Sequence, residues 1–167
     1  HMMDSGNLDR NTSAIDDGDA ISSATLSIFG KGIYDAFSQS VVATNANPAS
    51  NTDLVAGDYT DHTTDMTTEV GSGRITFANF SATAYNDFAL NATGLTLISK
   101  TAISKFGFRT SADFDNSAPT WSSGGNADAT AHTADAVGTS NDPKLVVVHA
   151  VAAAVSVPVT DEAIFFE

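Results

Sequence analysis

The sequence predicts an all-β protein, an antiparallel jelly-roll β-sandwich with one short crossover helix. Several short segments alternate apolar and polar residues with a period of two, which is the period of a half-buried strand. Clusters of Asn, Asp, Ser and Gly separate these segments and predict turns. Glu occurs only at positions 69, 162 and 167, so the other acidic residues are Asp. Because Asp favours turns and caps whereas Glu favours helix interiors, this composition argues against a helical protein.

The first expected strand covers residues 20–29, where Ala24, Leu26 and Ile28 lie on one face, and it is expected to end at Gly30. The other expected strands are short runs between turn clusters. They cover residues 40–44, 87–91, 104–110, 128–135 and 144–151, with further short pairings near 62–69 and 73–77. The last of these, residues 144–151, is an unbroken apolar run, which predicts burial on both faces or a cover over the strand.

Residues 92–100 form the one segment with a helical pattern, and they are expected to cross between two strands. Asn91 or Thr93 is a suitable N-cap, and Leu95 and Ile98 would then face the core. Residues 111–126 are expected to form a long loop.

The charge of the chain excludes some partners. It carries 7 basic and 20 acidic residues, with a net charge of −13, and it has no cysteine. No basic stripe is present to neutralise phosphates, so nucleic acid is not an expected partner. No apolar run is long enough to insert into a membrane. Without cysteine, disulfides and thiolate chemistry are excluded. The negative surface is typical both of simple solubility and of calcium-rich extracellular surroundings.

Three stretches of the chain resemble one family. They are AIDDGDAISSATLSIFG, DFALNATGLTLISKTAISKFGFRTSADFDNSAP and GTSNDPKLVVVHA. Together they resemble the opening, middle and closing parts of DNRLRE-type domains, jelly-roll modules similar to carbohydrate-binding modules. The resemblance covers roughly residues 13–150. It implies an extracellular, cell-surface or virion-surface location, and a structural, adhesive or carbohydrate-binding role.

The sequence departs from this family at its front. Family members have an aromatic-rich strand where this chain has residues 6–12, which are polar. Residues 1–12 are therefore expected to be a tag remnant and an irregular N-terminal segment, followed by a sandwich at 13–151. A missing strand would leave a sheet edge with unpaired backbone groups, which invites pairing with another strand.

Residues 152–167 are expected to be a C-terminal tail that follows the sandwich, a candidate donor or closing strand. Pro158 is unfavourable in a central strand, but the apolar run Ile164, Phe165 and Phe166 resembles the strand that the front lacks. Three explanations stay open. The tail fills its own sheet, or it is donated to the next copy in a homopolymer held by strand exchange, or it is a linker to another domain.

Two acidic clusters are candidates for calcium, a possible cofactor. Asp16, Asp17 and Asp19 crowd oxygen ligands onto one short turn, although their spacing is not that of an EF-hand. Asp113 and Asp115, with Asn116, form a second cluster. A turn exposed to water is the other interpretation of both clusters.

The candidate carbohydrate site centres on Trp121, the one tryptophan, which lies in a Ser- and Gly-rich loop. An exposed aromatic ring stacks on sugar faces, and Asp115, Asn116 and Asn126 would bind hydroxyl groups. The other interpretation is that Trp121 covers the sandwich as a lid. A polysaccharide is the partner that this site implies.

No pattern for catalysis is present. The chain lacks a GxSxG nucleophile elbow, and His62, His132 and His149 show no metal-ligand spacing. The function expected is therefore non-catalytic: a structural or adhesive module, self-assembling into a filament or surface layer by strand exchange, or alternatively a carbohydrate-binding module.

Overall fold

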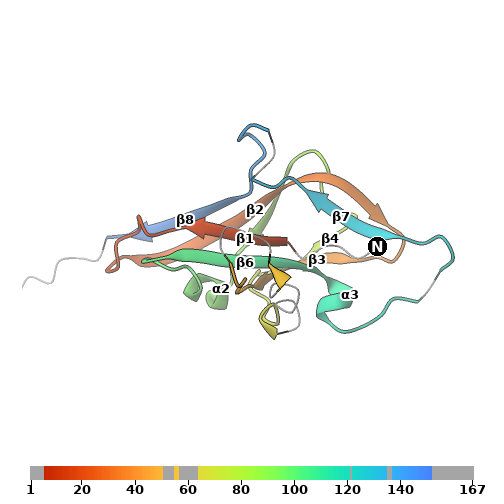
Figure 1. Cartoon of the computed structure of the whole chain (residues 1–167), viewed down its shortest axis with the longest axis horizontal. Coiled ribbons are helices and arrows are strands. Elements are labelled where there is room, and N and C mark those ends of the chain that lie inside the picture. Colours follow the sequence, from red (N-terminus) through yellow and green to blue (C-terminus); the bar gives the residue numbers. More distant parts are fainter. Residues whose placement is uncertain (1–5, 51–54, 57–63, 121, 135–136, 152–167) are drawn as a thin grey trace, which may run out of the picture.

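The fold was obtained as a computed structural model, which describes residues 6–50, 55–56, 64–120, 122–134 and 137–151. Two antiparallel sheets pack face to face, so the predicted all-β sandwich is confirmed (Figure 1). The finer jelly-roll arrangement stays a prediction. Within the described part of the chain, no helix is long and apolar enough to cross a membrane.

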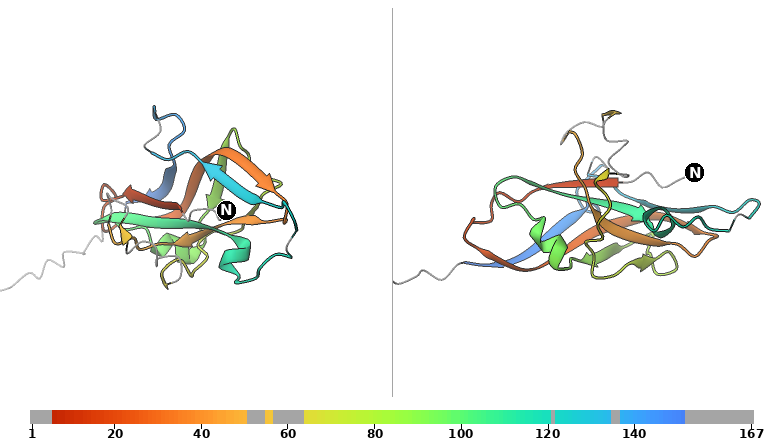
Figure 2. Two further views of the ribbon diagram at one scale, coloured as in Figure 1. Left: turned by 45° about the vertical axis from the view of Figure 1, so that its right-hand side comes forward. Right: turned by 90° about the horizontal axis from the view of Figure 1, so that it is seen from below.

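The first sheet contains four strands in the order β1-β6-β3-β4. Their bounds are β1 Gly6–Asn11, β3 Ser40–Asn45, β4 Ile75–Thr76 and β6 Ile103–Thr110. The second sheet is built on β2 Ala20–Asp35, which pairs with β5 Tyr85–Ala89, β7 Ala127–Ala131 and β8 Lys144–Ala150. Figure 2 shows the two sheets as separate layers.

The strand β2 carries the second sheet because each part of its length has a partner. Residues 20–27 pair with β8, residues 25–29 pair with β5, and residues 30–35 pair with β7. Its alternation behaves as predicted: Ala24, Leu26 and Ile28 are buried between the sheets. The strand does not end at Gly30, however, and continues across a register shift to Asp35.

The core lies between the layers and is dominated by aromatic side chains. Phe88 of β5 and Phe108 of β6 contact each other across the sheets, with ring centroids 5.3 Å apart. Phe106, Phe77 and Val41 are fully buried. Burying each such side chain is worth roughly 1.5–3 kcal/mol. This core holds the two sheets together.

The predicted crossover helix is present as α2 Ala92–Thr96, which connects β5 in one sheet to β6 in the other. The Asn91 side chain caps it by accepting a hydrogen bond of 2.9 Å from the Gly94 amide. Ile98 is buried and Leu95 is partly buried against the core, as the helical pattern predicts. The loop that follows β6 begins with a second short helix, α3 Ser111–Phe114, which the sequence did not predict.

Two predictions about the ends of the sandwich are wrong. Residues 6–11, expected to be irregular, form β1 and pair with residues 103–108 of β6. The sheet edge that was expected to be unpaired is therefore occupied by this polar strand. A polar segment can form the strand because the hydrogen bonds between strands join backbone groups. Residues 144–150 form the expected last strand, but β8 is not buried on both faces. Val146 and Val148 are each 54% exposed.

Gly30 is required by close approach of the backbone. A Cβ added at Gly30 would lie 1.9 Å from the Ser81 carbonyl oxygen, whereas one added at Gly73 would meet nothing within 4 Å. We expect Gly30→Ala to destabilise the fold by about 1–3 kcal/mol, since the backbone must shift. Gly73→Ala is the matched control. Chemical denaturation of the two variants compares their free energies of unfolding, and an equal loss in both would contradict the packing argument.

Candidate functional site

The acidic turn before β2 is held by a lysine and a histidine from distant parts of the chain. The Lys100 ammonium donates a hydrogen bond of 2.8 Å to the Asp17 carbonyl oxygen and another to the Asp19 carbonyl oxygen. The Asp19 carboxylate is only 4% exposed and lies 2.6 Å from Nδ1 of His149 on β8. Asp16 and Asp17 remain exposed. The turn is thus tied to both the α2–β6 connection and the end of β8.

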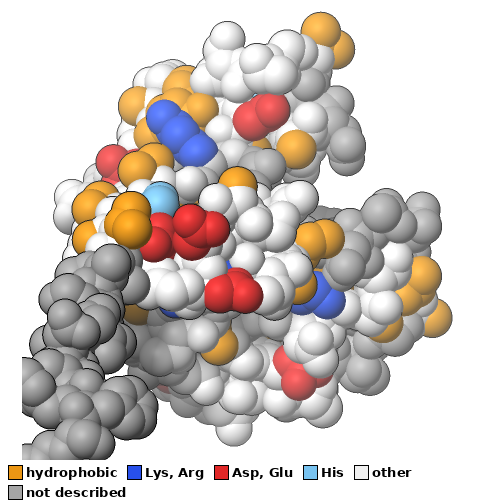
Figure 3. Space-filling model, turned by 90° about the vertical axis from the view of Figure 1, so that its left-hand side faces the viewer, with side chains coloured by type: hydrophobic (Ala, Val, Ile, Leu, Met, Phe, Trp, Pro, Cys, Tyr) orange, Lys and Arg blue, Asp and Glu red, His pale blue; other side chains and the backbone are white. Residues whose placement is uncertain are grey.

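A shallow open depression of about 710 Å³ lies beside this turn, lined by Asp16, Asp19, Lys100 and Val151 among others. Figure 3 looks onto this end of the molecule, where carboxylates, a histidine and hydrophobic side chains lie next to one another. The described residues contain no group of three or more His, Cys, Asp or Glu side chains placed to hold a metal. Calcium at this turn stays a prediction, and the Lys100 ammonium occupies two of the carbonyl groups that an ion would use.

The second predicted acidic cluster is engaged in ion pairs. Arg74 donates two hydrogen bonds to Asp115, of 2.6 and 2.9 Å, and also binds Glu69. The hydrogen bonds from Arg74 hold the pKa of the Asp115 carboxyl below its ordinary value. The hydrogen bonds that Arg74 makes to Asp115, and to a smaller extent those to Glu69, raise the pKa of the Arg74 guanidinium. The neighbouring Asp113 binds Arg109 at 2.7 Å. These carboxylates fix the loop after β6 to the sandwich.

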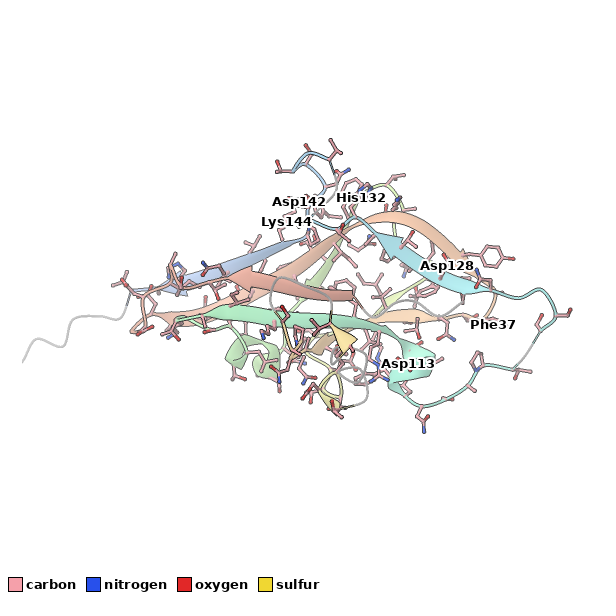
Figure 4. All side chains as sticks on the ribbon, in the orientation of Figure 1. Phe37, Asp113, Asp128, His132, Asp142 and Lys144 are labelled. Carbon is pink, nitrogen blue, oxygen red and sulfur yellow. The ribbon has the colours of Figure 1, made fainter. Side chains whose placement is uncertain are left out.

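A groove of about 490 Å³ lies between this loop and the connection from β2 to β3. Phe37 and Asp115 line it together with main-chain and hydroxyl groups, and Figure 4 shows Phe37 near α3 at this end of the molecule. Of the predicted sugar-binding residues, only Asp115 is among its lining residues. Asn126 instead donates to Asp128 at 2.6 Å, and Asn116 is an exposed residue with a φ of 49°. Trp121 lies outside the described residues.

The start of β8 is anchored by an aromatic cluster on the outer face of the second sheet. The Lys144 ammonium lies 3.4 Å from the centre of the Tyr85 ring, and that ring packs edge-on against Phe29. The Tyr85 hydroxyl donates to the carbonyl oxygens of Ser140 and Asp142, at 2.8 and 3.0 Å. Figure 4 shows Lys144 and Asp142 close together where the chain enters β8.

The strand β8 is anchored at both ends but open along one side. Lys144 binds Tyr85 at its start, and His149 binds Asp19 at its end. Between them, Leu145 and Val147 pack against the core while Val146 and Val148 face water. Within the part of the chain that the structure describes, β8 pairs with β2 alone. It is therefore an edge strand with an exposed apolar face, an arrangement that favours pairing with another strand.

Sequence reasoning did not find the groups that anchor β8. Asp19 and His149 are 130 residues apart, and Lys144 and Tyr85 come from different strands, so no local pattern connects them. The predicted strand-exchange residues, Ile164, Phe165 and Phe166, lie outside the described residues. The only local signal was the apolar run of β8 itself, which was interpreted as a buried strand.

Comparison of the chain with models of protein families, with curated proteins and with solved structures finds no match in any of the three. The resemblance to DNRLRE-type domains therefore stays a prediction, and the function is argued from the described residues.

Lys100 provides a test of the acidic turn. We expect Lys100→Met to lower the free energy of unfolding by about 1 kcal/mol, because two carbonyl groups lose a charged donor at a half-exposed position. Lys31→Met, at an exposed lysine of β2, is the control. Thermal melts of both variants and of the unsubstituted protein measure the effect.

The same thermal melts, repeated with excess chelator, test whether the acidic turn binds calcium. If calcium binds at this turn, the chelator lowers the melting temperature of the unsubstituted protein by several degrees, since a bound ion stabilises the native state; an unchanged melting curve would contradict the calcium prediction.

Proposed function

We propose that the protein is a non-catalytic structural or adhesive module of an extracellular or surface assembly. Copies assemble into a filament or surface layer by strand exchange, in which one copy donates a strand to the sheet of the next. The observation that carries this proposal is the open edge of β8 with its exposed apolar face. The resemblance to modules of large surface proteins supports the location.

Three of the exposed large hydrophobic residues lie on β8 or just after it. Val146 and Val148 stand beside each other on the outer face, and Val151, just after the strand, is 80% exposed. From Leu145 to Val148 the strand carries no charge, proline or glycine. Natural proteins protect edge strands with charges, prolines or bulges. The register shift in the β2–β8 pairing lies between Ile21 and Ser23, opposite the end of β8. The apolar part from Leu145 to Val148 carries no charge or proline, which favours its use as an interaction site.

An added strand would supply what this edge lacks. It would pair the free backbone groups of β8 and cover part of the exposed valine surface. Burying an exposed apolar side chain completely stabilises a protein by roughly 1.5–3 kcal/mol. Because Val146 and Val148 are about half exposed, covering each of them would contribute part of this free energy. The apolar residues at 163–166 are the donor that this sequence offers.

A second function has one observation in its favour. The groove of about 490 Å³ has an aromatic residue, Phe37, and several hydroxyl groups in its lining, which suits a polysaccharide. Its loop continues directly into Trp121. The runner-up proposal is therefore a carbohydrate-binding module at this end of the sandwich.

The two functions make different demands on Trp121. If the module binds polysaccharide, Trp121→Ala abolishes retention by any insoluble polysaccharide that retains the parent protein, because stacking of the indole ring on the sugar face is lost, while the melting temperature changes little. If the variant unfolds, Trp121 is a structural lid. Under the strand-exchange proposal we expect retention to be absent or unchanged by the substitution.

Strand exchange predicts that particle size depends on concentration. We expect the full chain to grow from single copies to larger species as its concentration is raised, and more so at high salt, because copies with a net charge of −13 repel one another. Replacing Phe165 and Phe166 with Asp should leave single copies that are as stable as before. Sedimentation velocity measures both. A full chain that remains a single copy at every concentration and salt level would contradict the proposed function.

A further inference from the structure

The hydrogen bonds of β2 identify which backbone groups of β8 are free. The Ala24 carbonyl accepts a hydrogen bond from the Leu90 amide, and the Gly30 amide donates to the Ala84 carbonyl, so both residues bond toward the β5 side. The Phe29 carbonyl accepts from the His132 amide on the opposite side of β2. Successive residues of a strand direct their N–H and C=O groups to opposite sides. Thr25 and Ser27 therefore bond toward β8.

Their partners on β8 follow from the register, in which Thr25 is opposite Val146 and Ser27 is opposite Lys144. Lys144 and Val146 thus bond to β2. By the same alternation, the N–H and C=O groups of Leu145, Val147 and His149 point away from β2, to the side where no described strand pairs with β8. The free edge of β8 consists of these three residues.

The residue pattern of β8 is matched in the segment that follows it. Residues 144–149 of β8 read as Lys144, four apolar residues and His149; residues 162–167 read as Glu162, four apolar residues and Glu167. The two six-residue segments have the same pattern, and the charge of Lys144 is complementary to that of Glu167. Opposite charges facing each other across a strand pair are stabilising.

We propose that the free edge of β8 is the acceptor for residues 162–167, which add to it as an antiparallel strand with Glu167 opposite Lys144 and Glu162 opposite His149. That the donor belongs to a second copy rests on the proposed function. In this register Phe166 and Ile164 lie beside Leu145 and Val147 on the core side of the sheet.

The register is specified by the apolar pattern. Phe165 lies opposite Val146 on the outer face, where 54% of the valine is exposed. A slip of one residue would exchange the two faces of the incoming strand, and a slip of two would place an acid opposite a valine. Either slip loses the match between the charged ends.

The connection is long enough for this pairing. Residues 152–161 extend at most about 33–36 Å, and β8 with its seven residues is about 23 Å long. This length allows residues 162–167 either to fold back onto the β8 edge of the same copy or to extend to the β8 edge of a copy packed beside it. The experiment therefore has to identify the acceptor edge and the donor copy separately.

Engineered cysteines provide this experiment, because the chain has no cysteine of its own. Val146 and Phe165 would form a non-hydrogen-bonded pair, with Cα atoms about 4.5 Å apart, which is within the range that a disulfide spans. We expect the full-length protein carrying Val146→Cys and Phe165→Cys to form this disulfide to near completion under mild oxidation. Val146→Cys with Ile164→Cys is the matched control, since Ile164 would face the opposite side of the sheet.

Non-reducing electrophoresis with peptide mapping distinguishes the outcomes. A ladder of linked chains in the first variant alone supports both the β8 acceptor and the proposed function. A disulfide within single chains supports the acceptor and overturns donation to a second copy. Absence of the disulfide, or equal formation in the control, overturns the acceptor proposal, while concentration-dependent size would still leave the proposed function standing. Melting curves of both reduced variants confirm that they fold.

Discussion

The pairing of β2 with three other strands is the constraint on which the rest of the structure depends. It sets the register of β5, β7 and β8, and among the described residues it leaves β8 with a partner strand on one side only. Because the N–H and C=O groups alternate along a strand, this register also decides which residues of β8 offer free hydrogen-bonding groups. Lys144 and His149 fix the two ends of β8 to Tyr85 and Asp19. Between these ends, the described structure leaves Val146 and Val148 exposed to water.

Much of the fold was predictable because it depends on local patterns. The period-two alternation at Ala24, Leu26 and Ile28 predicted β2, and the cap at Asn91 predicted α2. Two elements were not predictable in this way. The polar strand β1 forms because β6 offers backbone partners, which no side-chain pattern records. An unbroken apolar run, such as that of β8, does not by itself reveal how many of its faces are covered.

The candidate sites were less predictable than the fold, since they depend on contacts between distant residues. Clusters of Asp suggested calcium, but in the structure the Asp19 carboxylate contacts His149 and the Asp115 carboxylate binds Arg74, so both carboxylates already have side-chain partners. In a chain with many Asp residues, the sequence does not show which of them meet a cation in the fold. The exposed edge of β8 became visible only once the position of β2 was known.

Amide hydrogen exchange in the assembled full-length protein tests the central claim most directly. Within β8, the amides of Val146 and Val148 point to β2, whereas those of Leu145 and Val147 point to the free edge. The account predicts that all four are protected in the assembly. In the variant with Asp at positions 165 and 166, it predicts that only Leu145 and Val147 exchange rapidly, giving an alternating pattern along the strand. Rapid exchange at Leu145 and Val147 in the assembled protein would contradict strand addition at this edge.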